Sequence, residues 1–416
     1  MTGRRRSTLA LLACAGVALL MVAGCGGDDS GGSQTAAGSG SKTLTVYVSL
    51  PFQGAGKSRS EDMLLGAKIA LQQAGGRAGK FKIKLATLDD STAQAGQWDP
   101  AATSAGARKA VTDKSTIAYL GELNSGATAV SLPVLNEAGI LQVSAANTAV
   151  GLTRKEGAEP GEPDKYYPSG KRTFGRVVPA DHLQAAASAQ YMKDNGCTSV
   201  YITNDNEVYG RGLAKQLQTI APTKGVEVKG FDGIEKTAAN YRALAGKVVG
   251  SGASCFYFGG ITANNAAQLY KDVHAAKPDM KLFGPDGVGD ADFTGAIPAS
   301  VAKQIYLTLP TLPPNKYPPA GQELIAQIKK QKGGKAPDVY AIYSYEAMNA
   351  ILQAIKDAGD NGDDRDAVVD AFFNIKDRHS VLGTYSIDEN GDTTLKDYGG
   401  YRIKHGEIVF EKVIRV

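Results

Sequence analysis

Short apolar runs alternate with longer stretches of helical periodicity through most of this chain. In the first part of the chain these runs lie at 43–48, 81–88, 116–120 and 140–143. Parallel strands need a long crossover between them, which is usually a helix, so this alternation favours a parallel sheet with helices on its faces. The stretches between the runs predict helices at 60–74, 102–112 and 125–138.

The same alternation begins again near Pro179. Strands are expected at 200–203, 226–231, 254–258 and 281–283, with helices at 182–195, 210–221, 240–250 and 262–275. A proline-rich stretch at 309–319 and a helix at 339–358 follow. The chain ends in a predicted β meander at 381–387, 400–404 and 408–413, with a turn at Asn390-Gly391. The whole pattern predicts an α/β protein with two doubly wound lobes.

The first 25 residues have the features of an export signal. Three arginines at 4–6 precede an apolar stretch at 9–22, which is short for a bilayer span and ends in Val22-Ala23-Gly24-Cys25. This ending resembles a bacterial lipobox, in which the cysteine becomes the lipidated first residue. Residues 26–42 contain no large apolar side chain and predict a flexible tether. We therefore expect a secreted lipoprotein, anchored through Cys25 at the outer face of the cell membrane; a transmembrane anchor is the alternative.

Charge and motifs exclude several classes of function. The net charge of +4 includes the three signal arginines, so the mature protein is nearly neutral and does not favour a nucleic-acid partner. The histidines and the remaining cysteines have no metal-ligand spacing, and no catalytic motif or cofactor fingerprint is present, so we expect neither an enzyme nor a cofactor. Residues 54–58 resemble a phosphate-binding loop, but the first glycine of that motif falls on Pro51, which lacks an N–H group.

Two cysteines lie in the predicted second lobe. Cys197 immediately precedes the run at 198–203, and Cys255 begins the run at 255–258. If these runs are the first and third strands of a doubly wound sheet, they are parallel neighbours and both cysteines lie at the same edge. A disulfide is therefore predicted, with two buried free thiols as the alternative. The segment 154–171, rich in glycine, proline and charge, is expected to be an exposed loop between the lobes.

Several sequence blocks together resemble type I periplasmic binding proteins, specifically the leucine/isoleucine/valine-binding family of ABC transporters. They span nearly the whole mature chain in the family's order. The blocks are Leu88-Asp89-Asp90, Gly121-Glu122-Leu123-Asn124-Ser125, 139–148, 204–212, Tyr257-Phe258-Gly259-Gly260, 283–288, 343–347 and Val381-Leu382-Gly383-Thr384-Tyr385.

The resemblance implies two lobes joined by three crossover segments, with the ligand between the lobes. The crossings are expected at 177–180, 307–311 and 375–381. Lobe 1 is then 43–178 plus 310–377, and lobe 2 is 179–308 plus 379–416.

The resemblance also implies which residues hold an amino acid. Ser125 opens a helix whose N-terminus suits a carboxylate, and Asn124 lines the same wall. The Ala146 carbonyl is expected to accept a hydrogen bond from the ammonium, and Thr148 to offer its hydroxyl and its amide to the ligand. Asp286 stands where the family has glutamate and is expected to pair with the ammonium. Tyr209 and Tyr345 match positions whose rings face the cleft. Local roles remain the alternatives: a simple cap for Ser125, turn contacts for Thr148 and Asp286, and packing for the tyrosines.

Two positions depart from the family. Ile261 replaces a tyrosine, and Arg59 replaces an aromatic residue near the first strand. A cation at that wall suits a polar or anionic ligand better than leucine, unless Arg59 points to solvent.

The resemblance implies a monomeric binding protein that closes its lobes on an amino acid, most simply a branched or aliphatic one, and delivers it to a membrane permease of an ABC importer. The alternatives are a binding protein for amides, urea or aromatic acids, and a ligand sensor of the same fold.

Overall fold

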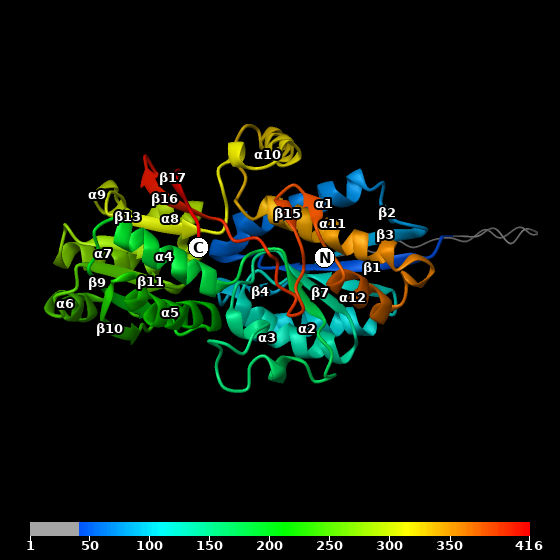
Figure 1. Cartoon of the computed structure of the whole chain (residues 1–416), viewed down its shortest axis with the longest axis horizontal. Helices are drawn as coiled ribbons and strands as arrows, with labels where there is room; N and C mark the ends of the chain where they lie inside the picture. Colours follow the sequence, from blue (N-terminus) through cyan, green and yellow to red (C-terminus); the bar gives the residue numbers. More distant parts are fainter. Residues whose placement is uncertain (1–40) are drawn as a thin grey trace, which may run out of the picture. The chain divides into compact units, whose positions relative to one another are not determined.

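A computed structural model describes residues 41–416, whose strands form two large sheets (Figure 1). The predicted signal peptide 1–25, the lipidated Cys25 and nearly all of the tether 26–42 lie outside the described residues. Within residues 41–416, no helix is both long enough and apolar enough to cross a membrane.

The first lobe is built on a six-stranded sheet with the order β2-β3-β1-β6-β7-β8. Its neighbours run parallel except for β2 and β3. On β1, Val46, Val48 and Leu50 are buried because helices cover the sheet on both faces. The strands are β1 (Thr43–Leu50), β2 (Arg77–Ala78), β3 (Phe81–Asp89), β6 (Thr116–Leu120), β7 (Leu141–Ser144) and β8 (Phe174–Arg176).

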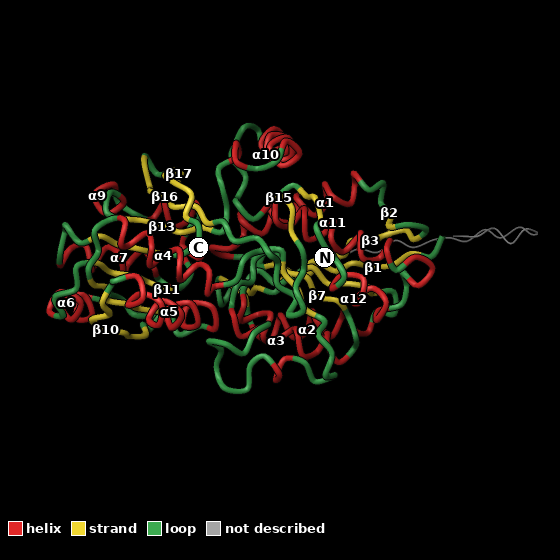
Figure 2. Tube along the Cα trace, viewed as in Figure 1, coloured by secondary structure: helices red, strands yellow, loops and turns green. Residues whose placement is uncertain are grey.

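Two groups of helices cover this sheet (Figure 2). Small residues of α1 such as Ala67 and Ala70 allow close packing against Ala347 and Ile351 of α11, in one core cluster with β1. Ala107 of α2 and Leu135 of α3 belong to a separate cluster with Tyr47 and Tyr119. The helices of this lobe are α1 (Lys57–Gln73), α2 (Pro100–Thr112), α3 (Ser125–Glu137), α10 (Pro319–Gln331), α11 (Ala341–Asp357) and α12 (Arg365–Phe373).

The second lobe has a seven-stranded sheet with the order β10-β9-β11-β12-β13-β16-β17. The first five strands are parallel, and β16 and β17 close the sheet as an antiparallel pair. The strands are β9 (Ser199–Asn204), β10 (Glu227–Gly233), β11 (Cys255–Gly259), β12 (Lys281–Gly284), β13 (Ile305–Leu309), β16 (Tyr398–Lys404) and β17 (Glu407–Ile414). The helices are α4 (Asp181–Asp194), α5 (Val208–Ile220), α6 (Arg242–Gly250), α7 (Ala266–Ala276), α8 (Ala291–Ala296) and α9 (Ala299–Ala302).

The predicted fold class, two doubly wound α/β lobes joined by crossover segments, is confirmed. The elements that the sequence pattern did not predict include β13 and α10. Both lie beside the proline-rich stretch, whose prolines masked the periodicity of the neighbouring segments.

Cys197 and Cys255 form a disulfide, with their Cα atoms 5.9 Å apart. This is the pairing that the sequence predicts. The expected neighbourhood of the two strands is also observed, because β9 and β11 are adjacent and parallel, and Cys255 is paired with Val200. The bond therefore ties the start of β11 to the turn before β9.

The third crossing lies further along the chain than predicted. Val381, Leu382, Tyr385 and Ile387 are buried in the core of the first lobe, and Leu395 packs against it. Residues 379–395 therefore belong with lobe 1 rather than lobe 2, and the chain crosses just before β16. The apolar side chains of this segment hold it against the core of lobe 1. The segment includes most of a two-stranded antiparallel sheet, formed by β14 (Arg378–Ser380) and β15 (Gly383–Tyr385).

The segment 154–171 is more than an exposed loop. Tyr166 and Tyr167 are buried against Leu132 and Phe174 of the first lobe. From the same segment, the carbonyl of Gly157 accepts a hydrogen bond from Gln216 Nε2 of α5 at 2.6 Å. The segment therefore also connects the two lobes.

Candidate ligand-binding site

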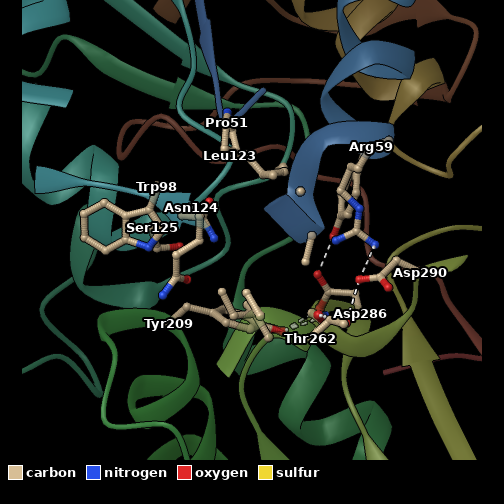
Figure 3. A pocket seen from close by; sticks show the side chains of 18 residues that line it. Pro51, Arg59, Trp98, Leu123, Asn124, Ser125, Tyr209, Thr262, Asp286 and Asp290 are labelled. Atoms are coloured by element: carbon tan, nitrogen blue, oxygen red, sulfur yellow. Dashed lines mark hydrogen bonds and ion pairs between the residues drawn. The ribbon is translucent and has the colours of Figure 1, made fainter. Parts of the chain in front are cut away.

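A cavity of about 650 Å³, including the part open to solvent, lies between the two lobes (Figure 3). In Figure 3, Trp98, Asn124 and Ser125 stand on one side of it, Arg59 and Asp290 on the other, and Asp286 and Tyr209 below. The first lobe contributes Pro51, Ala55, Gly56, Arg59, Gln97, Trp98, Leu123, Asn124, Ser125, Ala146 and Tyr340, and the second contributes Tyr209, Ile261, Thr262, Ala263, Asp286, Gly287 and Asp290.

The position of the cavity follows from the strand directions. Ser125 follows β6, Ala146 follows β7, Tyr209 follows β9 and Asp286 follows β12. In open parallel sheets the loops after the carboxyl ends of the strands form the ligand crevice. Two such sheets facing each other bring four loops to one cavity, although their residues are far apart in the sequence.

The N-terminus of α3 lies in the wall that the first lobe contributes to the cavity. Asn124 is its N-cap residue, but its side chain makes no capping hydrogen bond. Ser125 Oγ accepts a hydrogen bond from the Ala149 N–H at 3.3 Å, which joins the loops after β6 and β7. The first N–H groups of a helix lack partners within the helix and carry partial positive charge. This end of the cavity can therefore hold a carboxylate.

Asp286 is a nearly buried carboxylate in the wall of the second lobe. Tyr209 Oη donates to Asp286 Oδ1 at 2.8 Å, and Tyr340 Oη donates to Oδ2. Burial, together with the Asp286 charge, raises the pKa of both tyrosines well above the usual value. Both therefore stay neutral donors near neutral pH and hold the carboxylate in place for a cationic group.

Arg59 neither points to solvent nor offers a free cation to the ligand. Its side chain is buried, with Nε 3.0 Å from Asp338 Oδ2 and Nη2 donating to the Gly289 carbonyl at 3.1 Å. Asp290 Oδ2 lies 3.9 Å from Nη2, and the guanidinium stands over the Tyr340 ring. The charge of Arg59 is thus compensated by two carboxylates, so the predicted preference for an anionic ligand loses its basis.

The structure brings six of the predicted site residues to the cavity: Arg59, Asn124, Ser125, Ala146, Tyr209 and Asp286. Thr148 does not line it; this residue is buried, and its hydroxyl has no hydrogen-bond partner among residues 41–416. Tyr345 does not line it either. Its hydroxyl donates to Gln73 Oε1 at 2.5 Å, on the side of α11 that faces α1. Tyr340, which precedes α11, faces the cavity instead.

Other parts of the lining were not predicted from the sequence. Gln97 and Trp98 come from a small hairpin of β4 (Ser91–Thr92) and β5 (Gln97–Trp98). Gln97 Nε2 donates to Asn264 Oδ1 of the second lobe at 3.1 Å. In the second lobe, Thr262 Oγ1 donates a hydrogen bond to Asp290 Oδ2 at 2.7 Å. The one available signal was that Trp98 is the sole tryptophan of the chain.

The described residues offer no metal centre. Within 41–416, no group of three or more histidine, cysteine, aspartate or glutamate side chains is arranged to hold a metal ion.

Gly126 leaves room for the Trp98 ring beside the N-terminus of α3. A Cβ atom at Gly126 would lie 2.6 Å from Trp98 Cζ2. Gly126→Ala is therefore expected to displace the indole and lower ligand affinity roughly tenfold, as an overpacked site does. A ligand titration, followed through the fluorescence of Trp98, measures this loss of affinity. Gly246→Ala in α6, where a Cβ meets open space, is the matched control and should bind normally; equal affinity of both variants would show that the ring position is unimportant.

Comparison with known proteins gives a consistent result. A family model described as periplasmic binding protein matches residues 43–407. The chain is similar to the Leu/Ile/Val-binding protein homolog 1 of Brucella melitensis, at 27% identity over 375 residues that cover 89% of this chain and 92% of the relative.

Solved structures share the fold as well. The leucine binding protein of Thermotoga maritima has a TM-score of 0.78 at 20% identity and covers 89% of this chain and 99% of its own. A solute binding protein of R. palustris in complex with benzoate has a TM-score of 0.74 at 17% identity, covering 90% of this chain and 96% of its own.

Proposed function

Because the chain belongs to the periplasmic binding protein family, whose members bind solutes and are not enzymes, we propose that it is the substrate-binding protein of an amino acid ABC importer. The relatives named as Leu/Ile/Val-binding proteins support an aliphatic amino acid as the ligand. The observation that carries the proposal is that Asp286 and the N-terminus of α3 line the same cavity. An amino acid has one cationic and one anionic group, and these two features match them.

The remaining lining suits an aliphatic side chain. Pro51, Leu123, Ile261 and Ala263 are apolar, and the Trp98 ring adds an aromatic surface. Ligand pockets of this kind are mostly apolar, with a few polar groups that fix orientation. Arg59 is held by Asp338 and Gly289, so it narrows the cavity without adding an unpaired charge.

The mechanism that we propose is lobe closure. Interactions such as Gln97 with Asn264 and Arg59 with Gly289 link the two walls of the cavity. A ligand that contacts both Ser125 and Asp286 favours the arrangement in which those walls approach each other. A permease then recognises this arrangement, and no bond of the ligand changes.

We also infer that the protein works outside the cytoplasm. The family supports an extracytoplasmic place. The lipobox-like Val22-Ala23-Gly24-Cys25 and the tether 26–42 support a lipid anchor at the outer face of the membrane, which leaves the folded unit near its permease. The division into two lobes with three crossings supports a monomer that encloses its own site.

A second candidate ligand is an aromatic carboxylate. The R. palustris structure is in complex with benzoate, and here the Trp98 ring lies beside the N-terminus of α3. Such a ligand would use the N-terminus of α3 but would leave Asp286 without a cationic partner.

A thermal-shift screen of residues 42–416 against amino acids, amides and aromatic acids tests the proposal. Ligand present at about 100 times its Kd should stabilise the protein by about 2.7 kcal/mol, because it binds the folded state only. A rise in Tm with leucine, isoleucine or valine supports the main proposal. A rise with benzoate alone supports the second candidate, and no rise with any amino acid, using protein freed of co-purified ligand, contradicts the main proposal.

A further inference from the structure

Asp90 and Glu122 are two buried carboxyl groups that do not line the cavity. Asp90 directly follows β3 and Glu122 comes just after β6, and these two strands flank β1 on either side. Asp90 is 1% exposed and Glu122 is 0% exposed. Their carboxyl groups lie within hydrogen-bonding reach of each other. Two carboxylates that close cannot both be ionised without strong repulsion, so the pair needs a proton.

The hydrogen bonds around the pair also leave room for a proton. Tyr119 Oη donates to Glu122 Oε1 at 2.8 Å. Among residues 41–416, no N–H or O–H group is bonded to Glu122 Oε2 or to either carboxyl oxygen of Asp90. Buried polar groups are nearly always hydrogen-bonded, and an unpaired one costs free energy. A single proton removes most of this deficit, because a protonated carboxyl group becomes a donor.

The electrostatics of this region favour a proton on Asp90. Burial and the charge of Glu122 raise the pKa of Asp90 well above its usual value, and Asp89 acts in the same direction. Burial also raises the pKa of Glu122, whereas hydrogen bonds from Ser49 and Asp90 oppose that rise. Tyr119 also faces the pair, and burial and the Glu122 charge raise its pKa well above the usual value, so it remains a neutral donor.

The backbone of both residues supports the wall of the ligand cavity. The Asp90 carbonyl accepts a hydrogen bond from the Asp99 N–H at 2.7 Å, at the base of the hairpin of β4 and β5 that carries Trp98. Glu122 is followed directly by residues 123–125, which line the cavity at the N-terminus of α3. A bond between the two carboxyl groups therefore ties the hairpin to this helix end.

We propose that Asp90 and Glu122 share one proton, with the Asp90 carboxyl group donating to Glu122 Oε2, and that this acid pair positions the Trp98 hairpin against the N-terminus of α3. Both are positioning residues, because they act on a ligand only through the wall that they hold. Their effect on affinity rests on the proposed function. Their effect on the ligand-free protein does not.

The shared proton makes the stability of the fold depend on pH. In an unfolded chain the pKa of an aspartate is about 3.9, and in the folded protein the pKa of Asp90 is raised. The stabilisation is therefore fully present below about pH 4 and is lost as the pH rises through the folded-state pKa. Asp90→Asn keeps a donor to Glu122 at every pH, because an amide does not titrate. Relative to the unmodified protein, its Tm should rise by a few °C between about pH 5 and pH 8.

Asp90→Leu and Asp90→Asn, compared by leucine titration and by Trp98 fluorescence, test the positioning role. Leucine is similar in size to aspartate but has no donor, so it leaves Glu122 without its partner. Asp90→Leu should bind leucine roughly tenfold more weakly, a change of about 1.4 kcal/mol. It should also shift the emission of Trp98, the sole tryptophan, in the ligand-free protein. Asp90→Asn should restore both properties.

Asp272→Asn is the matched control. Asp272 is buried in the second lobe, where its two carboxyl oxygens accept hydrogen bonds from the Tyr241 N–H and from Gln268 Nε2. This variant should keep the leucine affinity and the Trp98 emission of the unmodified protein. The pH dependence of its Tm should also match that of the unmodified protein, because the Asp90 pair is intact.

Two results would overturn the proposal. A Tm difference between Asp90→Asn and the unmodified protein that is constant from about pH 5 to pH 8 would show that the pair shares no proton. Unchanged leucine affinity and Trp98 emission in Asp90→Leu would show that the pair does not position the hairpin. If Asp90→Leu does not fold, the pH dependence of Asp90→Asn still decides. Failure of the proposed function is distinguishable, since the unmodified protein would then bind no amino acid while the Tm and the emission of the ligand-free variants follow the expected pattern.

Discussion

Asp286→Ala is expected to weaken amino acid binding by roughly 100-fold or more, because truncating one partner of a buried charge pair costs about 2–5 kcal/mol. Tyr209 at 2.8 Å and Tyr340 hold the two oxygens of this carboxylate in place. Another acid would therefore not reproduce its geometry. The change also leaves both hydroxyls without their acceptor. Isothermal titration with leucine measures the loss.

The matched control for this change is Asp279→Ala. Asp279 belongs to the same lobe and precedes β12, but its side chain is exposed and lies outside the cavity lining. It should bind leucine normally. If Asp286→Ala bound leucine as tightly as the control does, the ammonium would lie elsewhere. If it bound benzoate unchanged and the unmodified protein bound no amino acid, the aromatic carboxylate would become the better proposal.

Arg176→Ala is expected to lower the free energy of unfolding by about 3–5 kcal/mol, because it breaks a buried ion pair from one side. Arg176 is 0% exposed. Its guanidinium binds Asp392 Oδ1 at 2.8 Å, Thr153 Oγ1 at 2.5 Å and the carbonyl of Ala149 at 2.8 Å. All of these acceptors would lose a donor at once. Thermal unfolding should show a fall in Tm on the order of 10 °C.

The same change should also affect the ligand site. Arg176 donates to the carbonyls of Asn147 and Ala149, which flank Thr148, so the loop after β7 would lose its support. Arg242→Ala, an exposed arginine at the start of α6, is the control and should leave Tm unchanged. A loss of stability in Arg176→Ala no larger than that of the control would show that the buried pair contributes little to the fold.

Local sequence patterns predicted the elements well, because their causes are local. The strands at 116–120 and 199–204 are buried along their whole length and mostly apolar, as expected for strands that are covered on both faces. The site residues found in advance, such as Ser125, Tyr209 and Asp286, come directly after such strands. Their position follows from the rule that parallel strands present ligands to the loops at their carboxyl ends.

The residues that sequence reasoning missed depend on distant partners. Arg59 contacts Asp338, which is 279 positions away, so no local pattern could tell that its charge is compensated. Tyr345 and Tyr340 are both aromatic residues near one end of α11, and only the packing of α11 against α1 decides which of them faces the cavity. Trp98 belongs to a two-residue strand whose sequence has no distinctive periodicity.

By itself, the sequence determined the α/β class, the two successive lobes, the disulfide pairing and most residues at the carboxyl ends of the strands, since periodicity and strand order act over short distances. The tertiary structure alone decided that residues 379–395 belong with the first lobe, that Arg59 is neutralised, and that Tyr340 rather than Tyr345 lines the cavity. These features depend on which side chains meet when two separately formed lobes pack together, and on the charges that this packing removes from water.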